Sequence, residues 1–192
     1  MEAIGGVLSA FGLAASAGLN AYVPLFLVAV IARFTNWIEL GPTWEPLTSW
    51  WVIGVLVLLG AVEFFADKIP AVNHANDVLQ TFVRPAAGAV LFAASTNVVT
   101  DIQPVVAMVA GLLIAGGVHV AKSAAVRPAV SATTAGVGNV PVSIAEDVVA
   151  TVLSILAIVV PVVVAALIIV ITSFVVWLLY RRARRLPQAP RA

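Results

Sequence analysis

Most of the charge outside the C-terminal tail lies at the ends of hydrophobic runs long enough to cross a membrane. A charged side chain near the bilayer centre costs about 2.5–3.5 kcal/mol on insertion scales, so such groups persist where they pair or line a wet cavity. These polar positions are therefore the first candidates for function. The candidate substrate- or ion-binding residues are Glu63, Asp67, Lys68, Asp77, Arg84, His119, Lys122, Arg127, Asn139, Glu146 and Asp147.

Two carboxylates close the hydrophobic run that ends near residue 66. Glu63 and Asp67 are four residues apart and share one helix face. Two neighbouring carboxylates can hold a cation or share a proton, because both do not ionise comfortably together. The alternative is that Asp67 pairs with Lys68 and only stabilises a helix end.

A cationic group follows the next long run. His119 and Lys122 are three residues apart, with Ser123 on the same face and Arg127 just beyond. These side chains could neutralise the acidic residues or bind an anionic substrate. A purely structural salt-bridge network is the alternative.

Glu146 and Asp147 lie near the start of the last hydrophobic block. The sequence predicts them in the first turn of a helix, where the positive end of the helix dipole favours carboxylates, with Ser143 as the N-cap. Capping explains one acidic residue better than two, so a functional role stays open.

The sequence disfavours a transition-metal site and an enzyme. His74 and Asp77 are three residues apart, but the chain has two histidines and no cysteine. Carboxylate sites for Na⁺, Mg²⁺ or Ca²⁺ have no diagnostic spacing here, so a metal stays open. Catalytic motifs of the Gly-x-Ser-x-Gly, His-Glu-x-x-His and Walker types are missing from the sequence. We expect no cofactor and no enzyme, with a lipid-modifying enzyme as the least favoured possibility.

Composition sets the class of protein that must position these residues. The chain of 192 residues is 62% hydrophobic and 10% charged, with a mean hydropathy of +1.10, whereas soluble domains carry about 25% charged residues. We therefore predict an all-α, polytopic membrane helix bundle with five to six membrane helices, some broken or re-entrant. The net charge of +1 offers no general attraction for nucleic acid.

Several elements depart from simple spanning helices. The block 3–34 would measure about 48 Å as one helix against a hydrocarbon core of about 30 Å, and Gly18, Asn20 and Pro24 interrupt it. A broken or re-entrant helix fits better than the alternative, one tilted and kinked helix. Predicted spans cover 50–66, 86–99 and 104–121. Residues 67–84 predict an amphipathic helix at the surface or across the bundle, and 123–143 predict irregular backbone lining a cavity.

The last apolar block, 144–180, is divided by Pro161 and forms either two spans or one kinked helix. Arginines are concentrated after residue 180, and cytoplasmic segments are rich in Lys and Arg. We therefore predict one transmembrane domain over 1–180 and a basic cytoplasmic tail over 181–192. Two crossings within 144–180 satisfy the charge rule, and one crossing does not.

One set of positions follows a specific order along the chain. These positions are Glu63, Asp67, Lys68, Pro70, Asp77, Arg84, Pro85, Gly88, His119, Lys122, Arg127, Asn139, Ser143, Glu146 and Asp147. Their order and spacing resemble a bacterial integral-membrane family called domain of unknown function 4126. The resemblance covers most of residues 10–160, while Arg127-Pro128 and residues 131–135 depart from the family pattern. It implies a bacterial plasma membrane protein and supports the choice of polar positions, without an activity to carry over.

Together these features predict a small transporter or channel-like protein for a small ion or polar solute in the lipid bilayer. The acidic residues would bind a cation or proton, or the basic residues an anion if the local charge is positive. Broken-helix ends near 18–24 and 136–141 would complete the cavity. The alternative is a structural or assembly protein whose charges form only salt bridges. Gly111, Ala115 and Gly116 would then pack helices, possibly between copies in a homo-oligomer.

Overall fold

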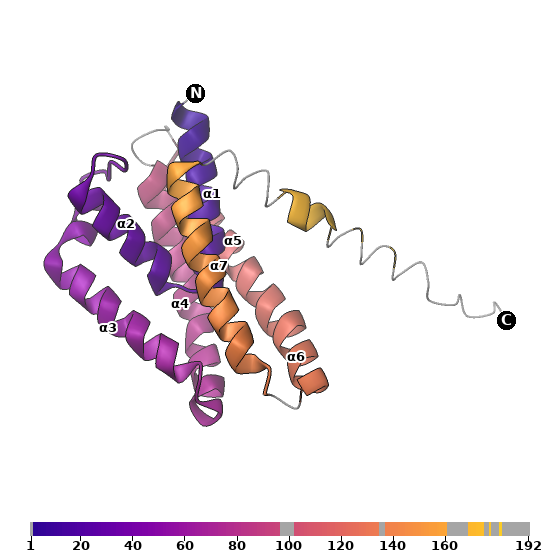
Figure 1. The fold of residues 1–192 in the computed structure, drawn as a ribbon. Coiled ribbons are helices and arrows are strands. Elements are labelled where there is room, and N and C mark those ends of the chain that lie inside the picture. Colours follow the sequence, from indigo (N-terminus) through magenta and orange to yellow (C-terminus); the bar gives the residue numbers. More distant parts are fainter. Residues whose placement is uncertain are drawn as a thin grey trace.

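The computed structural model describes residues 2–96, 102–134, 137–160 and 169–174, with residues 177 and 181. Within these ranges the regular structure is helical, and the prediction of an all-α fold is confirmed. Figure 1 shows the helices as a bundle. Its α-helices are α1 (Glu2–Leu19), α2 (Tyr22–Phe34), α3 (Trp50–Ala66), α4 (Pro70–Thr96), α5 (Pro104–Ala121), α6 (Arg127–Thr134) and α7 (Asn139–Val159).

Helices α1 and α2 form a hairpin, which confirms the predicted break in the first block. The chain turns back at Asn20 and Ala21, both buried, so that the outer ends of the two helices lie at the same end of the bundle (Figure 1). The Asn20 side-chain oxygen accepts hydrogen bonds from the backbone N–H groups of Tyr22 and Val23, at 3.0 and 3.1 Å. This side chain therefore caps α2 inside the protein.

Helix α4 corrects the prediction of a separate surface helix over 67–84 followed by a short span over 86–99. One helix runs from Pro70 to Thr96 and passes through Pro85. A proline within a helix removes one backbone hydrogen bond, but packing against α1 and α5 holds the helix together. The Thr81 hydroxyl also bonds the Asp77 carbonyl at 2.9 Å within this stretch. Helix α4 therefore carries polar residues into the bundle.

The prediction of irregular backbone over 123–143 is wrong for most of that stretch. A π-helical turn over Lys122–Val126 connects α5 directly to α6. Helix α7 then begins at Asn139, and Pro141 falls in its first turn, where a proline is tolerated. Ser143 is consequently inside α7 and is not its N-cap. Residues 135–136 lie outside the described residues.

Helix α7 ends at Val159, just before Pro161, as the predicted division of the last block requires. Two predictions fall on residues that are mostly outside the described ones. They are a second crossing by the rest of that block and the boundary between domain and tail at residue 180. Three described helices are long and apolar enough to cross a membrane, over Asn76–Thr96, Pro104–Thr134 and Asn139–Val159. Helices α1, α2 and α3 are shorter and apolar.

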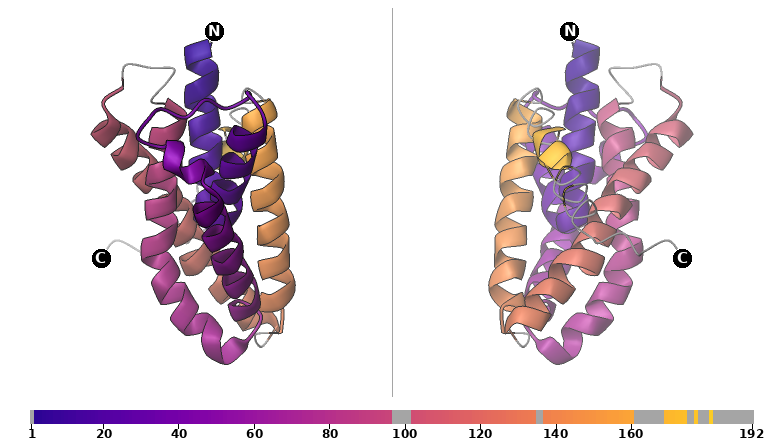
Figure 2. Two further views of the ribbon diagram at one scale, coloured as in Figure 1. Left: turned by 90° about the vertical axis from the view of Figure 1, so that its left-hand side faces the viewer. Right: turned by 90° about the vertical axis from the view of Figure 1, so that its right-hand side faces the viewer.

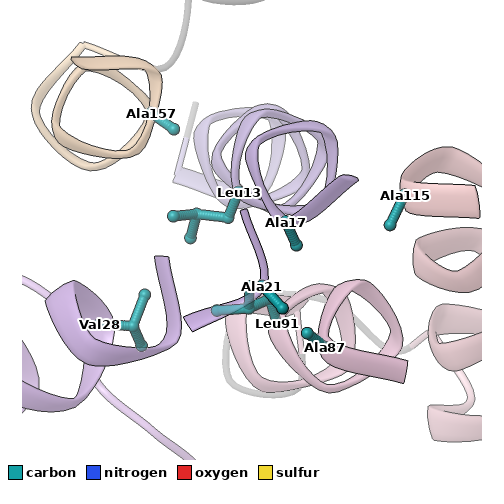
Figure 3. Close-up of a cluster of buried hydrophobic side chains, with 8 residues drawn as sticks. All are labelled: Leu13, Ala17, Ala21, Val28, Ala87, Leu91, Ala115 and Ala157. Atoms are coloured by element: carbon teal, nitrogen blue, oxygen red, sulfur yellow. The ribbon is translucent and has the colours of Figure 1, made fainter. Parts of the chain in front are cut away.

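Small residues hold α1, α4 and α5 together. A Cβ atom built on Gly88 would collide with Ala115, and one built on Gly111 would collide with the Gly88 backbone. Ala17, Ala87 and Ala115 face one another in the same core cluster (Figure 3). We call Gly18, Gly88, Gly111 and Ala115 the small-residue seam. The seam keeps these helices in close contact and fixes their relative register.

Candidate ion-binding site

Ten of the eleven predicted site residues come together through ion pairs and hydrogen bonds. Figure 2 shows the two connections next to them, from α3 to α4 and from α6 to α7, at the same end of the bundle. The eleventh, Asn139, hydrogen-bonds Ser131 instead. We call the ten residues the charged network. They are Glu63, Asp67, Lys68, Asp77, Arg84, His119, Lys122, Arg127, Glu146 and Asp147.

The most buried pair joins α3 to α4. Arg84 Nη2 lies 2.9 Å from Glu63 Oε1, and the two residues are 1% and 2% exposed. Arg84 Nη1 lies 3.4 Å from His119 Nδ1, and the other ring nitrogen of His119 lies 3.2 Å from the Thr81 hydroxyl. An uncharged His119 fits these contacts, because its Nδ1 can then accept a hydrogen bond from the guanidinium.

A second group surrounds the carboxylate of Asp67, at the end of α3. It accepts hydrogen bonds from Asn76 at 2.7 Å and from Ser143 at 3.1 Å, and Arg127 Nη2 lies 3.4 Å away. Burial by itself would raise the pKa of Asp67, but the charges and the Asn76 amide outweigh it, so the pKa lies below its ordinary value. Asp67 is therefore held as a carboxylate.

Arg127 links three acidic residues from three elements. Its Nη1 donates to both carboxylate oxygens of Asp77, at 2.8 and 2.7 Å. Its Nη2 faces Asp67 and lies 3.8 Å from Glu146 Oε2. A planar guanidinium can serve several carboxylates because its N–H donors point in fixed directions. Arg127 thus fixes α6 against α4 and α7.

Lys122 connects the charged network to the break between α1 and α2. Its Nζ lies 2.7 Å from Glu146 Oε2 and 3.1 Å from the carbonyl oxygen of Leu19. The next acidic residue, Asp147, accepts a hydrogen bond from Asn20 Nδ2 at 2.9 Å. Glu146 and Asp147 therefore meet the broken helix from neighbouring positions of α7.

The structure shows how three sets of these residues are paired. Glu63 and Asp67 do share a helix face, but each binds a different arginine. Lys68 does not pair with Asp67, because its Nζ reaches Asp147 at 3.6 Å and lies over the Phe64 ring. The predicted dipole contact of Glu146 and Asp147 is also wrong, since α7 begins several residues earlier.

Contrary to the prediction, the Ser123 side chain does not face the charged network. Its hydroxyl bonds the Val120 carbonyl of the preceding turn at 3.3 Å. The π-helical turn changes the angular spacing after Ala121, so the ordinary helical repeat fails for residues beyond it. His74 and Asp77 are the metal pair that the sequence disfavours, and the side chain of His74 lies outside the described ones. Among the described residues, no three His, Asp or Glu side chains form a group that could hold a metal ion.

Sequence reasoning missed several polar residues of this region. Asn20, Asn76 and Ser143 bind network carboxylates. The signal for one of them was available, since Asn76, Gln80 and Arg84 repeat every four residues along a continuous helix. All three residues already lie within the predicted helix over 67–84, but that helix was assigned to the surface or across the bundle and its polar face was not matched to the carboxylates.

The charged network contains five carboxylates and four cations when His119 is uncharged. Two buried oxygen atoms next to it, Glu63 Oε2 and Gln80 Oε1, have no hydrogen-bond partner. The Tyr22 side chain hydrogen-bonds Gln80 and lies within electrostatic range of Glu63. A region with excess negative charge and free oxygen acceptors attracts cations more strongly than anions.

The apolar helices and their buried ion pairs define a polytopic helical membrane protein. The family model described as Domain of unknown function (DUF4126) matches residues 7–181, and the chain therefore belongs to this family. No curated protein and no solved structure matches the chain.

Proposed function

We propose that this protein is a small transporter or channel-like protein that moves a small ion or polar solute, and that its substrate is a small cation, the proton included. One observation supports this most strongly: the buried break between α1 and α2 meets the charged network at Lys122 and Asp147. Interrupted helices in transporters place backbone ends and carboxylates around a substrate site. The excess of carboxylates over cations favours a cation.

The carboxylates have a chemical reason to serve in this role. A cation entering the protein loses water, and carboxylate and carbonyl oxygens replace that water as ligands. The surrounding arginines keep the acidic residues from repelling one another when the substrate is absent. Glu63 and Glu146 are the carboxylates we expect to matter most, because each places a buried carboxylate oxygen atom in the network.

We also propose a location for the protein. It lies in the bacterial plasma membrane with its basic tail in the cytoplasm, and it catalyses no enzymatic reaction. A homo-oligomer is compatible with this function. The lipid bilayer and the transported ion are the partners that the function requires.

Flux into proteoliposomes tests the proposal. Purified protein is reconstituted, and uptake of sodium, rubidium and protons is followed with radioactive ions and a pH-sensitive dye under an imposed membrane potential. Glu63→Gln and Glu146→Gln should each reduce flux at least tenfold. Glu45→Gln is the matched control, since Glu45 is exposed at the other end of α3. Equal flux in all four proteins, or none above empty liposomes, would contradict the proposal.

A structural role is the second candidate, because each of the nine charged side chains lies within 4 Å of an opposite charge. A surface cavity of about 750 Å³ lies away from the charged network, at the other end of α3, where residues such as Arg33, Glu39 and Trp50 line it. In the structural role the network variants lose stability, while the wild-type protein shows no flux. Thermal unfolding of the same proteins in detergent distinguishes the two functions.

A further inference from the structure

Lys122 is a buried cation placed between two kinds of oxygen. The residue is 4% exposed, and its ammonium group contacts the Glu146 carboxylate and the Leu19 carbonyl. These oxygens come from α7 and from the C-terminal end of α1, while the lysine comes from the π-helical turn after α5. Three elements that are distant in sequence thus converge on one positive charge.

The Leu19 carbonyl is free for this contact because the helix is broken. In a continuous helix it would accept the N–H of Val23, but that N–H donates to the Asn20 side chain instead. The next carbonyl, that of Asn20, also loses its donor, since Pro24 has no N–H. The end of α1 therefore presents carbonyl oxygens that lack their helical N–H donors and carry the partial negative charge of a helix C-terminus.

The contact between Lys122 and Glu146 is a short ion pair. Lys122 Nζ and Glu146 Oε2 are 2.7 Å apart, and this oxygen atom is buried. A spherical cation would satisfy this oxygen equally well, because ionic attraction does not require a particular angle. Arg127 lies farther from the same oxygen, at 3.8 Å.

We propose that the Leu19 carbonyl and the Glu146 carboxylate form a binding site for a small monovalent cation, which the Lys122 ammonium fills in the present conformation. The site rests on the proposed transport function and specifies its substrate class. Replacing one single positive charge by another keeps the charge of the network unchanged, whereas a divalent ion would not. Binding of the free ion requires Lys122 to move away, so this side chain competes with the substrate.

Cation binding to a lysine variant tests the site directly. In Lys122→Ala the ammonium is gone and the oxygens remain. Its thermal midpoint in detergent should rise by about 5 °C when NaCl, KCl or methylammonium chloride replaces choline chloride at equal ionic strength. Wild-type protein, whose own lysine fills the site, should shift by less than about 1 °C on the same scale.

Two further variants make the result specific. Lys68→Ala removes another cation of the same network but leaves Lys122 in place, so it should behave like the wild type. Lys122→Ala combined with Glu146→Gln should lose the cation-dependent shift. If Lys122→Ala does not fold, Lys122→Met is measured instead, because its side chain extends as far as the lysine Cε and leaves only the ammonium position empty.

The outcomes separate this site from the transport function. An equal shift in Lys68→Ala, or no shift in the Lys122 variants, would overturn the site whatever the flux assay shows. A cation-dependent shift that disappears with Glu146→Gln would support the site even in a protein that transports nothing. Flux without such a shift would leave the transport function standing and place the substrate elsewhere.

Discussion

The small-residue seam and the charged network are adjacent regions built on the same helices but held together by opposite means. On α4, Arg84 of the network lies one turn from Gly88 of the seam, and on α5, His119 lies one turn from Ala115. The seam is stable because side chains are absent and backbones touch. The network is stable because long side chains reach from one helix to another and pair with buried charges of opposite sign, which would be costly if left unpaired.

The difference between seam and network explains how a short membrane protein can be rigid and still have a polar interior. Steric packing in the seam does not respond to pH or to ions, so it fixes the relation between α4 and α5. Electrostatic contacts one turn away do respond to both. The seam can therefore serve as the fixed part against which network side chains, Lys122 above all, change partners.

The largest expected effect comes from breaking the Glu63–Arg84 pair. Arg84→Met leaves the Glu63 carboxylate buried without its cation and should reduce the free energy of unfolding by about 3–5 kcal/mol. The double variant Glu63→Met with Arg84→Met should recover at least half of that loss, since no charge is left unpaired. Thermal unfolding in detergent measures both, and a double variant as unstable as the single one contradicts the assignment.

Adding one methyl group to the seam should have the next largest effect. A Cβ at residue 111 collides with the Gly88 backbone, which has no side-chain freedom to yield. Gly111→Ala should therefore lower the free energy of unfolding by about 1–3 kcal/mol.

The matched control for this variant is Gly117→Ala, on the same helix. A Cβ there meets nothing within 4 Å, and alanine is the better helix former. It should unfold at the same temperature as wild type or slightly higher. Equal losses in the two alanine variants would show that α5 is sensitive to any substitution, and not to contact with α4.

The pH dependence of Asp67 should distinguish the network from the seam. Because its pKa in the folded protein is lowered, the stability it contributes is present above its ordinary pKa and is lost as the pH falls toward the folded value. The difference in thermal midpoint between wild type and Asp67→Asn should shrink from about pH 5 to about pH 3. Gly111→Ala should show a constant difference over that range, and a parallel decline in both would argue against the assignment.

The smallest expected effect is the loss of one hydrogen bond to Asp67. Ser143→Ala removes the hydroxyl that donates at 3.1 Å and should reduce the free energy of unfolding by about 1 kcal/mol. Ser123→Ala is the control, since its hydroxyl bonds only the carbonyl of its own helix. Chemical unfolding in mixed micelles should resolve the two, and equal stability would remove Ser143 from the network.

Much of the fold was predictable from local rules. The apolar runs predicted α3 and α5 with their ends, and Asn20 with Pro24 predicted the break in the first block. The errors occurred at prolines and small polar residues. Residues 67–84 and 86–99 were expected to form separate helices on either side of Pro85, but in a bundle neighbouring helices compensate for one missing hydrogen bond.

The candidate residues were also predictable in type, but their pairing was not. Glu63 and Lys122 were recognisable as charges in apolar surroundings. Their partners, Arg84 and Glu146, are 21 and 24 residues away along the chain. Spacing along one helix predicts which side chains share a face and cannot predict which other helix covers that face.

The sequence by itself determined the membrane class, the interruption of the first helix and the residues that must avoid lipid, because hydropathy and backbone chemistry act locally. Only the tertiary structure decided that Lys122 meets the freed carbonyl of Leu19 and that Asn139 lies apart from the network. Those contacts depend on the crossing of helices at the small-residue seam and on the π-helical turn, which set distances between segments that are remote along the chain.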